Sequence, residues 1–210
     1  MTNSARRIPH AAADFVICGN VTRDRTPDGW APGGTAVYAA AVARGLGRRV
    51  GVVTAAPVDV VAAGIAPEVA VARADVPEAT SFENIYTADG HRVQYLPAVG
   101  TPIPPETLPP AWADAPVVLL GPVFHEVSPA LAERFSGSVG VCAQGFLRQT
   151  DVNGRVTLMA PDAWDALPVL RHTRVLFLSE EDLAGAPDRA VPPAWLKTCL
   201  LYTSPSPRDS

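Results

Sequence analysis

The chain has 210 residues, of which 48% are hydrophobic and 18% charged. This composition is typical of a globular protein with one sizeable core and excludes a disordered chain. The formal net charge of −4 gives no basic field for nucleic acid or an anionic membrane, and no apolar run reaches membrane-spanning length. The N-terminus has two arginines but no apolar stretch after them, so we expect no signal peptide and a cytoplasmic protein.

Cysteine and histidine spacing gives no metal or disulfide motif. The three cysteines form no CxxC pair, and the four histidines stand far apart. Metal sites and disulfide frameworks need tighter, patterned spacing. We therefore expect no directly bound metal and no disulfide; the residues concerned are Cys18, Cys142, Cys199, His10, His91, His125 and His172.

The N-terminal half predicts an α/β protein. After a flexible segment 1–13, "DFVICGN" (Asp14–Asn20) has the pattern of a buried strand, and a turn-rich stretch follows it to "APGG". The residues Ala36–Leu46 are apolar on nearly every face and predict a packed helix that ends at a glycine. A second strand follows at Arg49–Ala55. Strand, crossover helix and strand together indicate a mostly parallel sheet.

A hairpin interrupts this pattern. Two β-rich runs, Phe82–Thr87 and Arg92–Leu96, flank "ADG", and a proline-rich connector, "VGTPIPPETLPPAWADAP", follows them across the surface. The α/β pattern then resumes with the strands "PVVLLGP", "VGVCAQG" and "TRVLFL". Between the first two, "SPALAERFSG" predicts a helix with Ser128 as its N-cap and Pro129 in its first turn. The whole pattern predicts a doubly wound α/β domain with a small β-hairpin appendage.

Ligands in such sheets bind beyond the carboxyl ends of the strands. Asp24 lies just past the first strand, and Gly33 and Gly34 stand just before the first helix. A carboxylate accepts hydrogen bonds from two hydroxyl groups, as a polyol requires, and adjacent glycines allow close backbone approach at a helix N-terminus. A tight turn beside a solvated aspartate explains the same spacing equally well. A dinucleotide fingerprint and a Walker A motif are both absent.

The segment from "DFVICGNVTRD" through "GGTAVYAAAVARGLGRRVGVVTA" resembles the opening of the ribokinase-like (PfkB) carbohydrate kinase family. The resemblance implies a ribokinase-like sheet whose hairpin, about residues 80–97, is the substrate lid, and it extends to about Gly185. The family's asparagine inside the double-glycine helix is replaced here by Tyr38. The details look most like the myo-inositol kinase branch: Asn20 follows the first strand, and "CAQGFLR" places Gln144 and Arg148 at a strand end.

The resemblance implies substrate contacts for Asp24, Gly33, Gly34, Asn20 and Gln144. The branch's aspartate before the glutamine is here Cys142. Local hydrogen bonds at a strand terminus are at least as good an explanation of Gln144 and Arg148. His125 and Glu126 also follow a strand, but a histidine without an identified partner is more often structural, so we assign it no catalysis.

A role in organising metal and phosphate through water is implied for Ser179 and Asp182, where many family members have Asn-x-x-Glu. N-capping by Ser179 of an acidic first turn is the simpler explanation. The family transfers the γ-phosphoryl group of ATP, with Mg²⁺, and its catalytic aspartate lies in a Gly-Ala-Gly-Asp motif. That motif is absent, so we expect the catalytic aspartate to lie beyond Thr198.

The end of the chain explains this absence. Cys199–Asp209, "CLLYTSPSPRD", resembles a translated sequencing adapter, so we expect residues 199–210 to be non-native. Residues 14–198 are then an incomplete ribokinase-like domain, truncated before the ATP-binding part. We expect this fragment to be inactive and to leave the apolar faces of its last strands uncovered.

The sequence thus predicts that the complete parent is a kinase for a small sugar or polyol, inositol among the candidates. Two alternatives remain: a non-catalytic small-molecule binding or regulatory protein on the same scaffold, and a nucleoside kinase. An exposed hairpin face also allows a homodimer through the lid.

Overall fold

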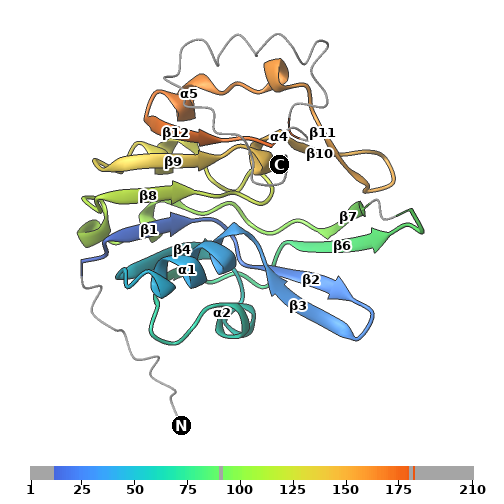
Figure 1. Ribbon diagram of the computed structural model, residues 1–210, viewed down its shortest axis with the longest axis horizontal. Coiled ribbons are helices and arrows are strands. Elements are labelled where there is room, and N and C mark those ends of the chain that lie inside the picture. Colours follow the sequence, from blue (N-terminus) through green and yellow to red (C-terminus); the bar gives the residue numbers. More distant parts are fainter. Residues whose placement is uncertain (1–11, 90–91, 180–181, 183–210) are drawn as a thin grey trace.

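The protein is built on a six-stranded parallel sheet (Figure 1). The computed structural model describes residues 12–89, 92–179 and 182. The strands lie in the order β12-β9-β8-β1-β4-β5, and every neighbouring pair is parallel. Their bounds are β1 (Phe15–Cys18), β4 (Val50–Ala55), β5 (Ala70–Ala74), β8 (Val117–Leu120), β9 (Ser138–Cys142) and β12 (Thr173–Phe177). The predicted mostly parallel α/β sheet is confirmed.

Helices α1 (Thr35–Gly45) and α2 (Val58–Gly64) cover one face of the sheet around β1 and β4. All six residues of β4 are buried, as the continuous apolar run of a strand covered on both faces requires. The buried positions of α1 are Ala36, Ala40 and Ala43, so small side chains bring this helix close to Ile17 and Val52. The predicted helix over Ala36–Leu46 is confirmed within a residue at each end.

The proline-rich connector and short helices cover the other face. The connector contributes three buried side chains, Ile103, Leu108 and Trp112, to the hydrophobic core on this face. This burial confirms that the segment packs against the domain. The connector carries two 3₁₀ turns, η1 (Pro105–Thr107) and η2 (Pro110–Trp112), and the rest of this face is formed by α3 (Pro129–Ala132), α4 (Gln144–Leu147) and α5 (Leu167–Leu170).

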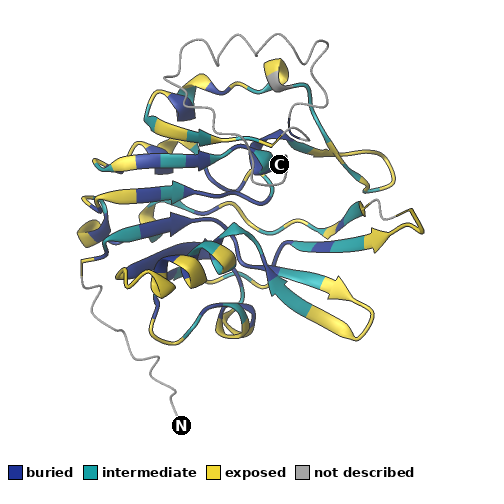
Figure 2. Ribbon diagram, viewed as in Figure 1, coloured by how far each residue is buried: buried dark blue, intermediate teal, exposed yellow. Residues whose placement is uncertain are grey.

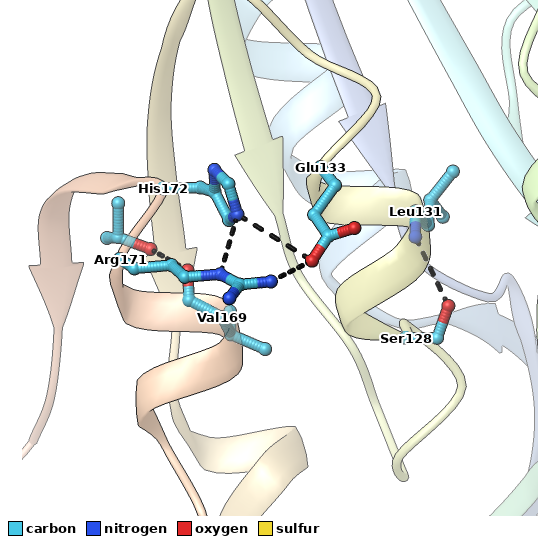
Figure 3. Close-up of polar contacts among 7 residues, drawn as sticks. Ser128, Leu131, Glu133, Val169, Arg171 and His172 are labelled. Atoms are coloured by element: carbon cyan, nitrogen blue, oxygen red, sulfur yellow. Dashed lines mark hydrogen bonds and ion pairs between the residues drawn. The ribbon is translucent and has the colours of Figure 1, made fainter.

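Figure 3 shows how α3 and α5 meet at the surface. The Ser128 side chain accepts a hydrogen bond from the backbone N–H of Leu131 at 3.3 Å, so the predicted N-cap is confirmed. The helix is shorter than predicted, since only four residues are helical. Arg171 at the end of α5 donates to Glu133 and also lies beside His172 (Figure 3). These groups are solvent-exposed or nearly so, which makes their contribution to stability small.

A second sheet forms the lid, with strand order β3-β2-β6-β7. Its strands are β2 (Thr22–Thr26), β3 (Gly29–Gly33), β6 (Ser81–Tyr86) and β7 (Arg92–Ala98). The predicted hairpin is β6 and β7. The prediction of turns between the first strand and the first helix was wrong, because this stretch forms the hairpin β2–β3. The polar sequence "TRDRT" gave no strand signal, and its pairing with β6 is tertiary.

A small hairpin completes the described chain. It comprises β10 (Arg148–Thr150) and β11 (Val156–Leu158), and a bridge from Arg155 to Tyr95 joins it to β7. The 3₁₀ turn η3 (Pro161–Ala163) follows. None of the helices in the described ranges is long and apolar enough to cross a membrane. The predicted flexible segment and adapter-like tail fall almost wholly outside the described residues.

The strands β8, β9 and β12 leave one apolar face open. Val117, Val175 and Phe177 are 42%, 50% and 52% exposed, and the exposed parts of β12 are visible in Figure 2. A groove of about 320 Å³ runs over these side chains, between Phe15 and Cys142. The expectation that the last strands have an uncovered apolar face therefore agrees with the described structure.

Candidate functional site

The lid sheet extends from the carboxyl ends of the central strands (Figure 1). The chain leaves β1 into β2 and β3, and α1 begins directly after β3. The lid, the N-terminus of α1 and the loop after β8 therefore meet at one edge of the sheet. This is the edge at which doubly wound sheets bind ligands.

Asp24 lies on β2, which pairs with β6, the strand that carries Phe82. Its Oδ1 accepts a long hydrogen bond, 3.4 Å, from the backbone N–H of Phe82. A Cβ added at Gly33 would lie 2.4 Å from Asp24 Oδ2, so only glycine lets this carboxylate rest against the strand that leads into α1. Burial raises the pKa of Asp24, against the opposing effects of the Thr22 hydroxyl, the Phe82 N–H and the Arg148 charge.

Gly34 forms the N-terminus of α1 in a conformation that other residues avoid. Its φ is +93°, and a Cβ there would lie 2.5 Å from the carbonyl oxygen of Asn20 and 3.2 Å from Val123. No side chain caps α1 at Gly34. The start of this eleven-residue helix, with its partial positive charge, thus lies next to the partly buried Asp24.

Arg148 joins the sheet edge to the lid. Its Nη1 donates to the carbonyl oxygen of Val123 at 2.9 Å, and its Nη2 donates to Gln144 Oε1 at 2.9 Å. The guanidinium carbon lies 4.8 Å from the centre of the Phe82 ring, within cation–π distance. The local hydrogen bonds anticipated for Gln144 and Arg148 are therefore present. Gln144 is the first residue of α4, directly after the loop that ends β9.

The guanidinium of Arg148 is largely removed from solvent, which is unusual for a cation. Burial, with a smaller effect of Arg92, lowers the pKa of Arg148 to about 10. The charges of Asp182, Glu126 and Asp24 oppose this change. With two donors used, the guanidinium keeps further N–H groups for a ligand. A partly buried cation thus lies between Asp24 of the lid and Asp182 after β12.

Asn20 is fully buried, and both ends of its side-chain amide are occupied. Its Oδ1 accepts from the backbone N–H of Ala55 at 2.8 Å, and its Nδ2 donates to the carbonyl oxygen of Thr101 at 3.1 Å. Because the side chain is fully buried, a ligand could reach Asn20 only if the surrounding residues moved. Its contact with substrate stays a prediction, while its link between β1, β4 and the connector is part of the observed structure.

Ser179 and Asp182 bond to each other. The backbone N–H of Ser179 donates to Asp182 Oδ2 at 2.8 Å, and the N–H of Asp182 donates to Ser179 Oγ at 3.2 Å. This is the reciprocal geometry of a capping box, in agreement with the N-cap predicted for Ser179. The other carboxylate oxygen, Oδ1, is buried and has no hydrogen-bond partner among the described residues. Residues 180, 181 and 183 onwards, where the next helix was expected, lie outside the described residues.

A buried acceptor without a partner is costly and indicates a missing donor or cation. Across the described residues, no group of three or more histidine, cysteine or acidic side chains forms a metal-binding cluster. The water-mediated metal contact implied for Asp182 stays a prediction. Asp182 also affects Cys142, because burial and the Asp182 charge together raise the pKa of this thiol to about 11.

Three site residues gave no signal in the sequence. Val123 and Phe82 are apolar residues of a loop and a strand, and only the fold brings them together around Arg148. Glu126 was considered only as a neighbour of His125. His125 itself has a positive φ of 59° and contacts the carbonyl oxygen of Arg148 through Nε2. Tyr38, at the family's asparagine position, is 67% exposed on α1.

The sheet, the β-lid and the site at their junction define an α/β protein with the ribokinase-like fold. A pyrophosphate-dependent myo-inositol-1 kinase converted into a myo-inositol-3 kinase has the same fold, with a TM-score of 0.66 and 20% identity over 82% of this chain and 62% of that chain. A pyrophosphate-dependent kinase in the ribokinase family, complexed with a pyrophosphate analog and myo-inositol, has a TM-score of 0.60 and 21% identity. The match covers 77% of this chain and 60% of that chain.

Ribokinase of Arabidopsis thaliana, complexed with ribose and ATP, is a more distant neighbour, with a TM-score of 0.50 and 13% identity over 79% of this chain and 59% of that chain. The chain therefore spans about three fifths of the length of these structures. No family model matches the sequence. No curated protein matches it either. The likeness establishes the fold, and activity has to be argued from the site.

Proposed function

We propose that this chain carries the acceptor side of a ribokinase-like kinase that phosphorylates a hydroxyl group of a small sugar or polyol, inositol among the candidates. One observation carries the proposal. The carboxylate of Asp24 is held, partly desolvated, against Gly33 beside the uncapped start of α1, and within the described residues it forms no ion pair. A carboxylate of this kind is suited to accept hydrogen bonds from two neighbouring hydroxyl groups.

The lid and Arg148 support the same proposal. Phe82 covers one side of Arg148 from the lid, so an acceptor that binds beside these two residues is shielded from water on that side. The free N–H groups of Arg148 would donate to the hydroxyl oxygens that Asp24 does not bind. Gln144 would orient Arg148 through its Oε1, and the N–H groups at the start of α1, which no side chain caps, would be available to the acceptor. Solved neighbours of this fold are complexed with myo-inositol and with ribose.

The phosphoryl donor is the second part of the proposal. ATP is our first candidate, although the neighbours include pyrophosphate-dependent kinases. Asp182 would hold the Mg²⁺ of the donor through water, with Ser179 fixing the carboxylate, and the ion would neutralise phosphate charge. The catalytic aspartate is expected beyond Thr198, so we propose that residues 1–198 bind the acceptor without transferring phosphate.

Acceptor binding tests the proposal directly. Thermal unfolding of the chain would be measured with myo-inositol, ribose, fructose and adenosine over a range of concentrations. We expect one of the polyols or sugars to raise the Tm as mass action predicts, and Asp24→Asn to abolish this increase. Asp28→Asn, in the exposed β2–β3 turn, is the matched control and should keep it. If no polyol or sugar raises the Tm, the proposal fails; a response to adenosine alone would favour the nucleoside kinase.

Turnover tests the second part. Assays with ATP or pyrophosphate, Mg²⁺ and the best-binding acceptor should show no phosphorylated product from this chain. Product formed by residues 1–198 would contradict our placement of the catalytic aspartate.

A non-catalytic binding protein on the same fold is the second candidate, favoured by the solvent-exposed Tyr38 at the family's asparagine position. A gene product extended past residue 198 that still binds the acceptor without turnover would support it.

A further inference from the structure

Glu126 is a buried carboxylate whose neighbours are all backbone N–H groups. It is 2% exposed. Its Oε1 accepts from the N–H of Asn20 at 2.8 Å, and its Oε2 accepts from the N–H of Phe124 at 2.7 Å. The N–H of Val123 lies between the two oxygens, at 2.8 and 3.0 Å. Across the described residues, no cation forms an ion pair with Glu126. Backbone N–H groups stabilise its charge directly, and the Arg148 charge acts on it at longer range.

These bonds tie two neighbouring strands together at the site edge. Asn20 follows β1, whereas Val123 and Phe124 follow β8, and the two strands pair in parallel. The backbone of Glu126 also takes part, because its carbonyl oxygen accepts from the N–H of Ile103 in the connector at 2.9 Å. The Glu126 side chain therefore binds the backbone N–H groups of two successive loop residues, Val123 and Phe124, while His125 is held separately by its N–H bond to the Gly145 carbonyl oxygen.

The same loop touches each part of the candidate site. The Val123 carbonyl oxygen holds Arg148 Nη1, and the Val123 side chain packs in a cluster with Phe82 of the lid. Val123 also lies against the position that a side chain on Gly34 would need. His125 contacts the Arg148 backbone. A displaced loop would thus move the guanidinium, the lid contact and the helix start together.

We propose that Glu126 is a positioning residue of the acceptor site: it holds the loop after β8 so that the Val123 carbonyl fixes the Arg148 guanidinium against the lid. It does not touch the acceptor, since its oxygens are buried among backbone N–H groups. Its effect on acceptor affinity rests on the proposed function, but its effect on the Arg148 geometry does not.

The test compares Glu126→Gln with Val139→Ala, a core control on β9 that is buried away from the site. Two-dimensional ¹H–¹⁵N spectra report the side-chain Nε–H of Arg148, which Arg148→Lys identifies by deleting its signal. In the wild-type chain this signal should be shifted and protected from exchange. Glu126→Gln should lose both features, because the amide nitrogen faces an N–H donor and the loop must move. Val139→Ala should keep them, although it also loses stability.

Acceptor affinity gives a second, independent measurement. By calorimetry with the acceptor found above, Glu126→Gln should bind about tenfold or more weakly, and Val139→Ala within about twofold. Adding Glu126→Gln to Arg148→Lys should cost little further affinity, because the first residue acts through the second. Additive losses, or an unchanged Arg148 signal in Glu126→Gln, would overturn the proposal.

Two outcomes need separate treatment. If Glu126→Gln does not fold, Glu126→Asp takes its place: it keeps the charge, but it is one methylene too short to reach Asn20 and Phe124 together. If no acceptor binds the wild-type chain, the proposed function fails, and the Arg148 signal alone still decides whether Glu126 positions this residue.

Discussion

Replacing Gly34 by alanine tests whether the start of α1 is strained, as its geometry indicates. The residue has φ 93° and ψ 156°, a region that is almost closed to residues with a Cβ and costs them about 1–3 kcal/mol. The new Cβ would also lie 2.5 Å from the Asn20 carbonyl oxygen. Such overlap with backbone cannot be relieved by a rotamer change and adds about 1–3 kcal/mol. We therefore expect a loss of roughly 2–6 kcal/mol.

Gly45→Ala is the matched control in the same helix. A Cβ at Gly45 meets nothing within 4 Å, and this position lies in the last turn of α1. The same chemical change should therefore stabilise the protein by about 0.5–1 kcal/mol, through the lower entropy of the unfolded chain.

Urea unfolding followed by circular dichroism measures both variants. We expect Gly34→Ala to lower the midpoint and Gly45→Ala to raise it slightly, with the m-value unchanged in each. A Gly34→Ala loss below about 1 kcal/mol would refute the reasoning, since it would mean that the loop and helix start relax freely.

Two further predictions concern charge and exposed apolar surface. Because the pKa of Asp24 is raised above its ordinary value of 3.8, the native state binds its proton more tightly, and ionisation of the buried group costs stability as the pH rises. Asp24→Asn should therefore be more stable than wild type at pH 7, and this gain should disappear below pH 3.8. Urea unfolding at a series of pH values measures the difference, and Asp28→Asn, the control, should show neither effect. Phe177→Ser, on the half-exposed face of β12, should reduce self-association in light scattering with little loss of stability. Val141→Ser, buried on β9, should instead cost about 2 kcal/mol or more; equal losses would mean that the Phe177 face is covered in solution.

Elements with a continuous apolar pattern were predictable. The buried run of β4, the alanine-rich face of α1 and the hairpin β6–β7 each carry their signal within a short stretch of sequence. The hairpin β2–β3 was not predictable, because "TRDRT" has neither the alternation of apolar and polar residues nor the residue types of a strand. It becomes a strand through its pairing with β3 and β6, and β6 lies far along the chain.

The candidate site divides in the same way. Short-range spacing singled out Asp24 and the two glycines, and the structure brings Gly33 against the Asp24 carboxylate, while their contact with substrate stays a prediction. The roles of Asn20 and Glu126 follow from hydrogen bonds between distant parts of the chain. Asn20 binds Ala55, which is 35 positions away, and Glu126 binds Asn20, which is 106 positions away, and no local sequence pattern reveals such pairs. The same is true of the Arg148–Phe82 contact, which joins β10 to the lid.

The sequence by itself determined the layered α/β architecture, since periodic burial of apolar side chains is a local property. It also placed the acidic and glycine residues at one edge of the sheet, because parallel strands end together. Only the tertiary structure decided which polar groups keep free hydrogen-bonding atoms and which are fully hydrogen-bonded within the protein. Asn20 is hydrogen-bonded through both its oxygen and its nitrogen, one oxygen of Asp182 has no partner in the described part of the chain, and Arg148 has N–H groups beyond the two bound by Val123 and Gln144. That division depends on distances between segments remote in the chain, which are fixed only when the core packs.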